Sequence, residues 1–258
     1  MSVPASAPRV CLFVDLDDSL FNSLRKCAPG AVLQPAALLA NGDVISYTSQ
    51  GQRALLAWLR QGAVVIPVTA RSVDAFARVL VDLPGPAVVS FGGVILDAQR
   101  RPDLQWAARM APELAAARPF LDEAFAKVTA WIAAHRTDAW VKLVEELGQT
   151  QYLLSKHRSA NAQALSEMAE QVLAPLAAAH PGWRVHQNDN NLTLLPPCLD
   201  KAHAVAYLME TLRASAGEIV TVGLGDSLSD TGFLSLCDYA MAPRGTQLGR
   251  RLLGGDRP

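Results

Sequence analysis

Residues 10–19 read VCLFVDLDDS, and this stretch decides how the rest of the chain is interpreted. Val10 to Val14 is an apolar run without polar alternation, which is typical of a strand buried in a parallel sheet. Asp15 and Asp17 follow directly, and ligands of open α/β sheets bind outside the carboxyl ends of the strands. Both carboxylates are therefore expected at a binding crevice, where one could attack a phosphorus atom and the other could transfer protons. A solvated or helix-capping turn is the alternative.

Further apolar runs and helical patterns alternate along the same parts of the chain. The predicted strands are Ala63–Val68, Ala87–Ser90, Glu218–Gly223 and Tyr239–Met241, and the predicted helices are Gln50–Gln61, Val73–Val81 and Ala202–Ala214. Such alternation favours an α/β fold with a Rossmann-like, doubly wound parallel sheet. The segment between Leu20 and Gln50 departs from it. Asn41-Gly42 predicts a tight hairpin turn there, so we expect a flap, with an irregular surface loop as the alternative.

Residues 99–194 follow a different pattern. The predicted elements are helices over Pro112–His135 and Ala160–Ala179 and strands over Ala139–Leu147, Gln151–Lys156, Trp183–Gln187 and Asn191–Leu195. Their order is αββαββ, which indicates an inserted α+β domain. The predicted domains are therefore a core of residues 1–98 and 195–258 and an insertion of residues 99–194.

Composition excludes several classes of partner. The 258 residues have a formal net charge of −1 and no dense run of Lys and Arg, so nucleic acid is not expected to bind. No apolar stretch approaches the roughly 20 residues of a membrane-spanning helix, and the start MSVPASAPRV lacks a signal peptide's features, so cytoplasm is the expected location. The cysteines lack zinc-ligand spacing and are interpreted as reduced packing residues: Cys11, Cys27, Cys198 and Cys237.

Two other predicted strands also end in polar groups. Thr69 and Arg71 follow the second strand, where a hydroxyl, a guanidinium and backbone amides suit phosphate oxygens, although a helix N-cap is the alternative for Thr69. The fourth strand runs into GLGDSLSD at positions 223–230, which holds Asp226 and Asp230. Magnesium commonly takes one or two protein carboxylates, so this turn predicts a metal site, with an acidic first helical turn as the alternative.

Lys201 stands just before the helix that leads to the fourth strand. A lone lysine at such a position is usually solvated. Beside Asp15, Asp226 and a phosphate, however, its ammonium would offset the repulsion between a carboxylate nucleophile and an anionic target.

Taken together and in this order, these segments resemble the signature motifs of the haloacid dehalogenase (HAD) superfamily. The matching motifs are Asp15-x-Asp17-x-Ser19, Thr69, Lys201 and Gly225-Asp226-x-x-x-Asp230. The resemblance covers roughly residues 9–98 and 195–245. The insertion resembles that superfamily's αββαββ (C2B-type) cap, found in sucrose-phosphate, trehalose-phosphate and mannosyl-3-phosphoglycerate phosphatases. The resemblance therefore implies the HAD fold with an inserted cap domain.

The resemblance also implies a role for each matching residue. Asp15 would be the nucleophile that is transiently phosphorylated, and Asp17 the general acid/base, with its backbone carbonyl on the metal. Asp230 would hold Lys201 or a metal-bound water. The implied sets are Asp15, Asp17, Thr69 and Lys201 for catalysis and Asp15, Asp17, Asp226 and Asp230 for Mg²⁺. Ser19 and Ser229, together with the Arg71 guanidinium that follows the second strand, are predicted to bind the substrate.

Three positions depart from the family pattern. Ser19 stands where threonine is commoner, and it keeps the hydroxyl. Ser229 and Gly92 stand where relatives usually carry asparagine. Ser229 can still donate a hydrogen bond, but Gly92 has no side chain, so ordinary substrate recognition from its loop is not expected.

The implied activity is magnesium-dependent hydrolysis of a phosphomonoester bound between core and cap. The type of cap favours a small phosphorylated metabolite, a sugar phosphate, as the substrate, and a monomer or homodimer is expected. A phosphosugar mutase and a non-catalytic phosphate-ligand sensor are the alternatives. Polar cap residues that could bind the substrate, or that could equally belong to a solvated strand face, are Lys142, Glu145, Lys156, His157, Arg158, His186 and Asn190.

Overall fold

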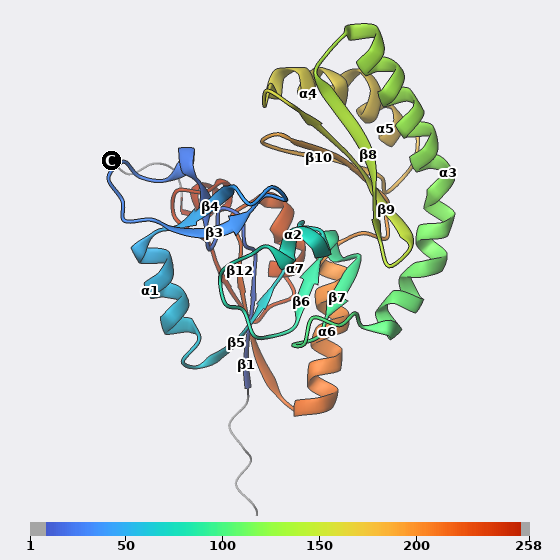
Figure 1. The fold of residues 1–258 in the computed structure, drawn as a ribbon. Coiled ribbons are helices and arrows are strands. Elements are labelled where there is room, and N and C mark those ends of the chain that lie inside the picture. Colours follow the sequence, from blue (N-terminus) through green and yellow to red (C-terminus); the bar gives the residue numbers. More distant parts are fainter. Residues whose placement is uncertain (1–8, 254–258) are drawn as a thin grey trace, which may run out of the picture. The chain divides into compact units, whose positions relative to one another are not determined.

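The computed structural model describes residues 9–253, which fall into two compact units (Figure 1). Unit 1 comprises residues 1–103 and 201–258, and unit 2 comprises residues 104–200. Residues 1–8 and 254–258 lie outside the described part. The expectation that the chain has no signal peptide rests on residues 1–10, so most of its basis lies outside the described residues. Within residues 9–253, no helix is both long and apolar enough to cross a membrane.

Unit 1 is built on a parallel sheet with the strand order β13-β12-β1-β5. Its strands are β1 (Arg9–Val14), β5 (Ala63–Pro67), β12 (Ile219–Leu224) and β13 (Tyr239–Met241). Figure 1 shows α1 (Gln50–Leu59) on one side of this sheet and α6 (Lys201–Ala216) on the other. The predicted α/β class with a doubly wound parallel sheet is confirmed. Because β1 is central, Asp15 leaves the sheet between two neighbouring strands.

The strand predicted over Ala87–Ser90 joins this sheet less fully than expected. β6 (Ala87–Val89) pairs antiparallel with β7 (Val94–Leu96) and meets the continuation of β5 through one parallel bridge, Val68 to Val88. The chain reverses sharply between the two strands, and Ser90, Phe91 and Gly92 all have positive φ angles. This short reversal keeps β6 with β7 rather than in a full parallel ladder.

The flap segment after β1 contains β2 (Asn22–Ser23), β3 (Gln34–Leu38) and β4 (Val44–Thr48), in the order β2-β4-β3. The predicted hairpin at Asn41-Gly42 is confirmed, and Gly42 has the positive φ of 89° that its turn requires. The flap also ends α2 (Val73–Ala77) earlier than predicted. The Leu80 N–H donates to the Ala36 carbonyl (2.8 Å), so the chain after α2 pairs with β3 instead of continuing the helix.

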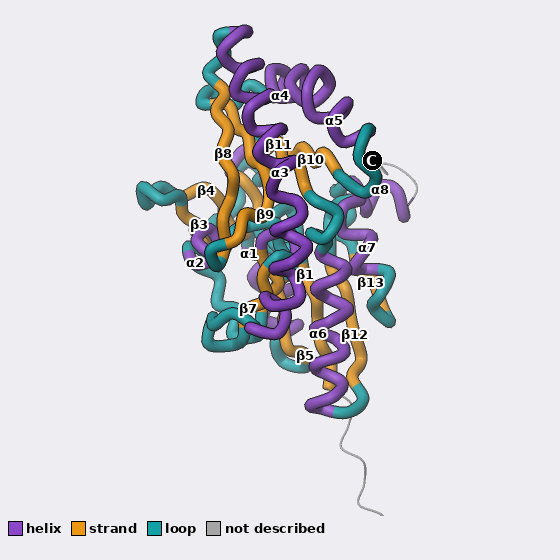
Figure 2. Tube along the Cα trace, turned by 90° about the vertical axis from the view of Figure 1, so that its right-hand side faces the viewer, coloured by secondary structure: helices purple, strands orange, loops and turns teal. Residues whose placement is uncertain are grey.

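Unit 2 is an antiparallel sheet, in the order β10-β11-β9-β8, with helices on one face. Its elements are α3 (Leu104–His135), β8 (Ala139–Glu146), β9 (Gln149–His157), α4 (Ala162–Met168), a π-helical turn (Ala169–Leu173), α5 (Ala174–Ala178), β10 (Arg184–Asn188) and β11 (Asn191–Leu195). Figure 2 shows α3 running along the strands. Helix α3 begins earlier than the predicted Pro112 because Trp106 and Met110 continue its buried stripe.

Local contacts set the limits of the two units a few residues from the predicted positions. The Asp103 N–H donates to the Ile95 carbonyl (2.8 Å), which keeps residues 99–103 with unit 1. At the other end, the Arg184 guanidinium donates to the Leu199 carbonyl and pairs with Asp200, which keeps residues 195–200 with unit 2. A cap role for unit 2 stays a prediction from the resemblance.

Candidate functional site

The carboxyl edge of the parallel sheet brings three distant segments together. The Asp15 N–H donates to the Leu224 carbonyl (2.8 Å), and the Val68 N–H donates to the Val14 carbonyl (2.8 Å). The chain after β1 therefore lies between the segment that leads to Asp226 and the segment that leads to Thr69. The backbone hydrogen bonds between neighbouring strands therefore bring Asp15, Thr69 and Asp226 to the same edge of the sheet, although they are far apart in the sequence.

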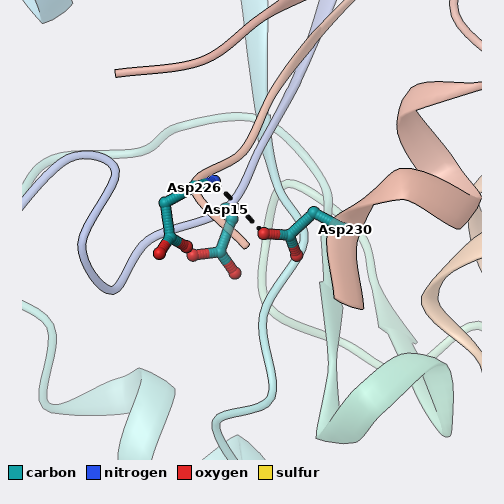
Figure 3. Close-up of side chains that lie close together, drawn as sticks. All are labelled: Asp15, Asp226 and Asp230. Carbon is teal, nitrogen blue, oxygen red and sulfur yellow. Dashed lines mark hydrogen bonds between the residues drawn. The ribbon is translucent and has the colours of Figure 1, made fainter. Parts of the chain in front are cut away.

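Three carboxylates converge at this edge. Asp15, Asp226 and Asp230 each have an oxygen within 4.8 Å of the others. Figure 3 shows the carboxylates of Asp15 and Asp226 next to each other, with that of Asp230 directed toward them. Asp15 and Asp230 are buried, whereas Asp226 is partly exposed. The cluster is thus open to a ligand on the side of Asp226.

Lys201 joins two of these carboxylates from the first position of α6. Its Nζ donates to Oδ1 of Asp15 (2.6 Å) and to Oδ1 of Asp230 (2.7 Å), and its side chain is only 8% exposed. Burial acts to lower the pKa of Lys201, but the two carboxylate charges outweigh burial and raise the pKa above its usual value. Lys201 therefore stays an ammonium ion.

Burial dominates the behaviour of Asp15. It raises the pKa of Asp15 well above the usual value, the ammonium of Lys201 opposes this effect, and the charges of Asp230 and Asp17 add to it. An ionised Asp15 thus depends on nearby positive charge. Lys201 supplies one such charge, and a bound cation would supply more.

Asp230 is held in its ionised form by the loop that carries it. Its Oδ2 accepts hydrogen bonds from the N–H groups of Asp226 (3.2 Å) and Ser227 (3.1 Å) and from the Ser227 hydroxyl (3.0 Å). Burial acts to raise the pKa of Asp230, but Lys201 and these hydrogen bonds lower it below its usual value. A Cβ on Gly225 would lie 2.7 Å from Cβ of Asp230, so only glycine allows this close approach.

Ser227 is a site residue that the sequence reasoning did not assign. Its hydroxyl and Asp230 form a capping box across the short 3-10 turn of Leu228–Asp230. The Ser-x-x-Asp spacing is the sequence signature of such a box, so this role could have been found from the sequence.

Asp226 has a strongly perturbed acidity. Burial raises its pKa to about 7, with further contributions from the charges of Asp230 and Asp18, while Lys201 and Lys26 act in the opposite direction. Within residues 9–253, its carboxylate accepts no hydrogen bond. Asp226 is therefore the carboxylate of the cluster that is left available to a ligand.

Asp226→Asn is expected to stabilise the metal-free protein above pH 7. Because the folded-state pKa of Asp226 is about 7, the contribution of Asp226 to stability is full near pH 4 and is lost as the pH rises through 7. Removing the charge should raise the melting temperature in EDTA by about 2–6 °C at pH 8, and by little at pH 4.5. Thermal unfolding across this pH range measures the effect. The exposed Asp82 gives the control Asp82→Asn, and equal shifts in both variants would contradict the prediction.

Asp17 and Arg71 form a two-pronged ion pair. Nε of Arg71 donates to Oδ2 of Asp17 (2.9 Å), and Nη2 donates to Oδ1 (2.8 Å). The guanidinium also lies over the Phe21 ring, 5.1 Å from its centroid, and Nη2 reaches the Ser46 hydroxyl of the flap (3.4 Å). A planar fork of this kind fixes the orientation of a carboxylate. In the described structure the Arg71 guanidinium is therefore paired with Asp17, and its part in substrate binding stays a prediction.

The remaining predicted residues lie at the same edge or on its rim. Thr69 is buried, and its hydroxyl accepts a hydrogen bond from the Arg71 N–H (3.1 Å). The Ser19 hydroxyl is buried and has no partner among the described residues. Ser229 is exposed, and its hydroxyl lies 2.7 Å from that of Ser227. The Phe91 N–H donates to the Thr69 carbonyl (3.2 Å), so the loop that holds Gly92 passes close to Thr69.

The donor set of the cluster fits a hard divalent cation. Magnesium prefers oxygen ligands, and here three carboxylates lie close together while the Lys201 ammonium pairs with two of them. Asp226 and Asp15 offer the oxygens that are least committed to other groups, since three hydrogen bonds occupy Oδ2 of Asp230. These residues therefore suit a magnesium ion on the side of Asp226.

In unit 2, the structure assigns a structural role to some of the polar candidates. The side chain of Asn190 donates to the His157 carbonyl (2.8 Å) and accepts from the His157 N–H (2.9 Å), which ties the β10–β11 turn to β9. Glu145 lies 3.9 Å from the Arg118 guanidinium. Lys142 is exposed on β8. A part in substrate binding stays a prediction for all seven polar candidates, which are Lys142, Glu145, Lys156, His157, Arg158, His186 and Asn190.

Comparison with known proteins identifies the fold. No protein-family model matches the sequence, and a search of the curated proteins finds no significant match. Among solved structures, the sucrose-phosphatase of Synechocystis sp. PCC6803, in complex with sucrose and phosphate, is 19% identical, with 96% of this chain and 89% of that chain covered and a TM-score of 0.53. The C-terminal domain of the C. albicans trehalose-6-phosphate phosphatase is 14% identical, with 88% and 73% covered and a TM-score of 0.54. The chain therefore shares the fold of these two proteins, as the resemblance of its sequence motifs predicts.

Proposed function

We propose that the protein is a magnesium-dependent phosphatase that hydrolyses a phosphomonoester through an aspartyl-phosphate on Asp15. The observation that carries the proposal is the Lys201 ammonium, which bridges buried Asp15 and Asp230 beside Asp226. Burying such charges costs stability, so clusters of this kind are concentrated at functional sites. The fold shared with two sugar-phosphate phosphatases supports the same reaction class.

In the first step, a carboxylate oxygen of Asp15 attacks the phosphorus atom in line, and the bond to the ester oxygen breaks. Asp17 gives its proton to the departing alcohol. In the second step, Asp17 takes a proton from a water molecule that attacks the phosphoryl group, which releases inorganic phosphate and restores Asp15. The fork from Arg71 would orient the Asp17 carboxylate while it is ionised, as in the second step. One of the two hydrogen bonds would have to open for Asp17 to carry the proton that it gives in the first step.

Charge compensation comes from the residues around Asp15. Lys201 offsets the repulsion between the carboxylate nucleophile and the anionic ester, and Asp230 fixes the position of the ammonium. Asp226 and Asp15 would hold the magnesium ion, together with the Asp17 carbonyl that the motif resemblance implies. Magnesium, when bound, neutralises negative charge on the phosphoryl oxygens. The Thr69 hydroxyl and the amides of the following turn would bind the same oxygens.

A sugar phosphate is the proposed substrate, because both solved structures described above are sugar-phosphate phosphatases by name. Unit 2 would then select the sugar, with Lys142, Lys156 and His186 among the candidates. A cytoplasmic location and a monomeric or homodimeric state stay predictions from the sequence.

A panel of phosphomonoesters tests the proposal. Sugar phosphates, nucleotides and p-nitrophenyl phosphate are assayed for phosphate release with Mg²⁺ and with EDTA. We expect turnover that needs Mg²⁺ and a preference of at least about tenfold for one sugar phosphate. Ligand-induced thermal stabilisation without any turnover would instead identify a sensor. Transfer of the phosphoryl group within a sugar bisphosphate would identify a mutase.

A further inference from the structure

The flap makes two contacts with the Arg71 guanidinium that do not involve Asp17. Nη2 of Arg71 donates to the Ser46 hydroxyl on β4 (3.4 Å), and Cζ of Arg71 lies 5.1 Å from the centroid of the Phe21 ring, just before β2. Both flap residues are buried. A guanidinium that lies over a ring and donates at its edge is restrained in both position and plane. The flap therefore holds Arg71 in addition to the fork on Asp17.

The two flap residues are themselves held by backbone hydrogen bonds. The Phe21 N–H donates to the Leu16 carbonyl (3.2 Å), which ties Phe21 to the turn that follows β1. Ser46 lies in the middle strand of the flap, where it is paired with Ser23 of β2 on one side and with Ala37 of β3 on the other. The guanidinium thus contacts side chains whose backbone is fixed.

Arg71 is more deeply placed than the carboxylate that it holds. Its own backbone is anchored, because the Arg71 N–H donates to the Thr69 hydroxyl (3.1 Å) and the Arg71 carbonyl accepts from the Ser90 N–H (2.7 Å). The side chain of Arg71 is 14% exposed, whereas that of Asp17 is 43% exposed. The Asp17 carboxylate is therefore the more accessible of the two groups to a ligand, and Arg71 lies behind it.

The flap contacts do not depend on the charge of Asp17. Each hydrogen bond of the fork is strong only to an ionised oxygen, so one of them opens when Asp17 carries the proton that it gives to the alcohol. Nη2 of Arg71, which donates to Oδ1 of Asp17, has a second acceptor in the Ser46 hydroxyl. The ring of Phe21 likewise still attracts the guanidinium. The flap would therefore keep Arg71 in place until the fork forms again.

We propose that Phe21 and Ser46 are positioning residues for the protonation of the leaving alcohol. They keep the Arg71 guanidinium beside Asp17, and Arg71 orients the carboxyl group that gives the proton. This inference rests on the proposed function. It predicts that the flap matters to the extent that the leaving group needs a proton. An alkoxide must be protonated as it departs, whereas p-nitrophenolate is stable as an anion.

Two esters with different leaving groups, benzyl phosphate and p-nitrophenyl phosphate, test the inference. The quantity compared is kcat/KM, because the alcohol departs in the first step and the later hydrolysis does not affect kcat/KM. For benzyl phosphate, we expect a loss of about 10²-fold in Arg71→Met and of about threefold to tenfold in both Ser46→Ala and Phe21→Leu. For p-nitrophenyl phosphate, the two flap variants should stay within about twofold of the wild type and Arg71→Met within about fivefold.

Ser23→Ala is the matched control for Ser46→Ala. Ser23 lies opposite Ser46 in the flap, and its hydroxyl is also buried but has no hydrogen-bond partner among the described residues. Its kcat/KM should stay within about twofold of the wild type for both esters. Thermal unfolding checks that each variant is folded, and Ser46→Ala keeps the test valid if Phe21→Leu is not.

The remaining outcomes separate this inference from the proposed function. Equal losses with the two esters would mean that the flap contacts serve binding or folding, and a rise in KM alone in Arg71→Met would mean that Arg71 binds the substrate. Either result contradicts the inference and leaves the proposed function standing. A wild type that cleaves p-nitrophenyl phosphate but not benzyl phosphate contradicts it as well, because the leaving alcohol then receives no proton. If the wild type cleaves no phosphomonoester at all, both are wrong.

Discussion

Asp15→Asn is expected to abolish magnesium-dependent phosphate release, with a loss of at least about 10⁴-fold in kcat. An amide has nearly the shape of a carboxylate but cannot act as a nucleophile toward phosphorus. The amide oxygen can still accept the hydrogen bond that Nζ of Lys201 donates to Oδ1 of Asp15 (2.6 Å) in the wild-type protein. The backbone bond from residue 15 to the Leu224 carbonyl also remains. The variant should therefore fold, and the loss should be chemical rather than structural.

Initial rates with the best substrate of the panel measure this loss, and circular dichroism checks the fold. Asp82→Asn, at a carboxylate that is 82% exposed, is the matched control and should keep its rate within about twofold. Mass spectrometry of acid-quenched wild-type protein should find a phosphoryl group on Asp15. Undiminished turnover in Asp15→Asn would eliminate this residue as the nucleophile.

The backbone arrangement of the site could be predicted from the sequence because it follows from strand patterns. The apolar run before Asp15 is a central strand, and the run before Asp226 is its parallel neighbour, so both carboxylates emerge at one edge. Lys201 could be placed as well, since the helix pattern begins beside it. The αββαββ order of unit 2 could also be predicted, because the spacing of apolar residues differs clearly between its helices and its strands.

The side-chain pairing could not be predicted in the same way. The Asp17–Arg71 fork joins residues 54 positions apart, and it depends on a flap that brings Ser46 and Phe21 to the same guanidinium. A pattern of apolar and polar residues shows which face a residue occupies, but it does not show which of several nearby charges it will contact. The early end of α2 has the same cause, because the competing hydrogen bonds come from β3.

The charges around Lys201 lead to the largest expected effect on stability. Lys201→Met keeps much of the length of the side chain but removes the ammonium that Asp15 and Asp230 share. The cost of leaving a buried charge without its partner is about 3–5 kcal/mol in proteins. For a unit of this size, such a cost corresponds to a fall in melting temperature of about 6–20 °C at pH 8.

The pH dependence of this fall distinguishes lost charge pairing from lost packing. Lys201 helps to keep the pKa of Asp230 below its usual value, so the stabilisation that Asp230 contributes is present at neutral pH and is lost as the pH falls through the folded-state pKa. In Lys201→Met both carboxyl groups can take up protons as the pH is lowered, which relieves the unpaired charge. The gap in melting temperature between variant and wild type should therefore narrow toward pH 4.5.

Lys127→Met removes an exposed ammonium that lies 2.7 Å from Glu123, and it provides the comparison for thermal unfolding across the same pH range. Exposed pairs of this kind contribute little to stability, because water already solvates both charges. The control should therefore lose no more than about 2 °C at any pH. Equal losses in the two variants at pH 8 would mean that Asp15 and Asp230 do not need the ammonium to stay buried. In that case the charge compensation on which the nucleophile of the proposed reaction depends would have to come from the metal ion alone.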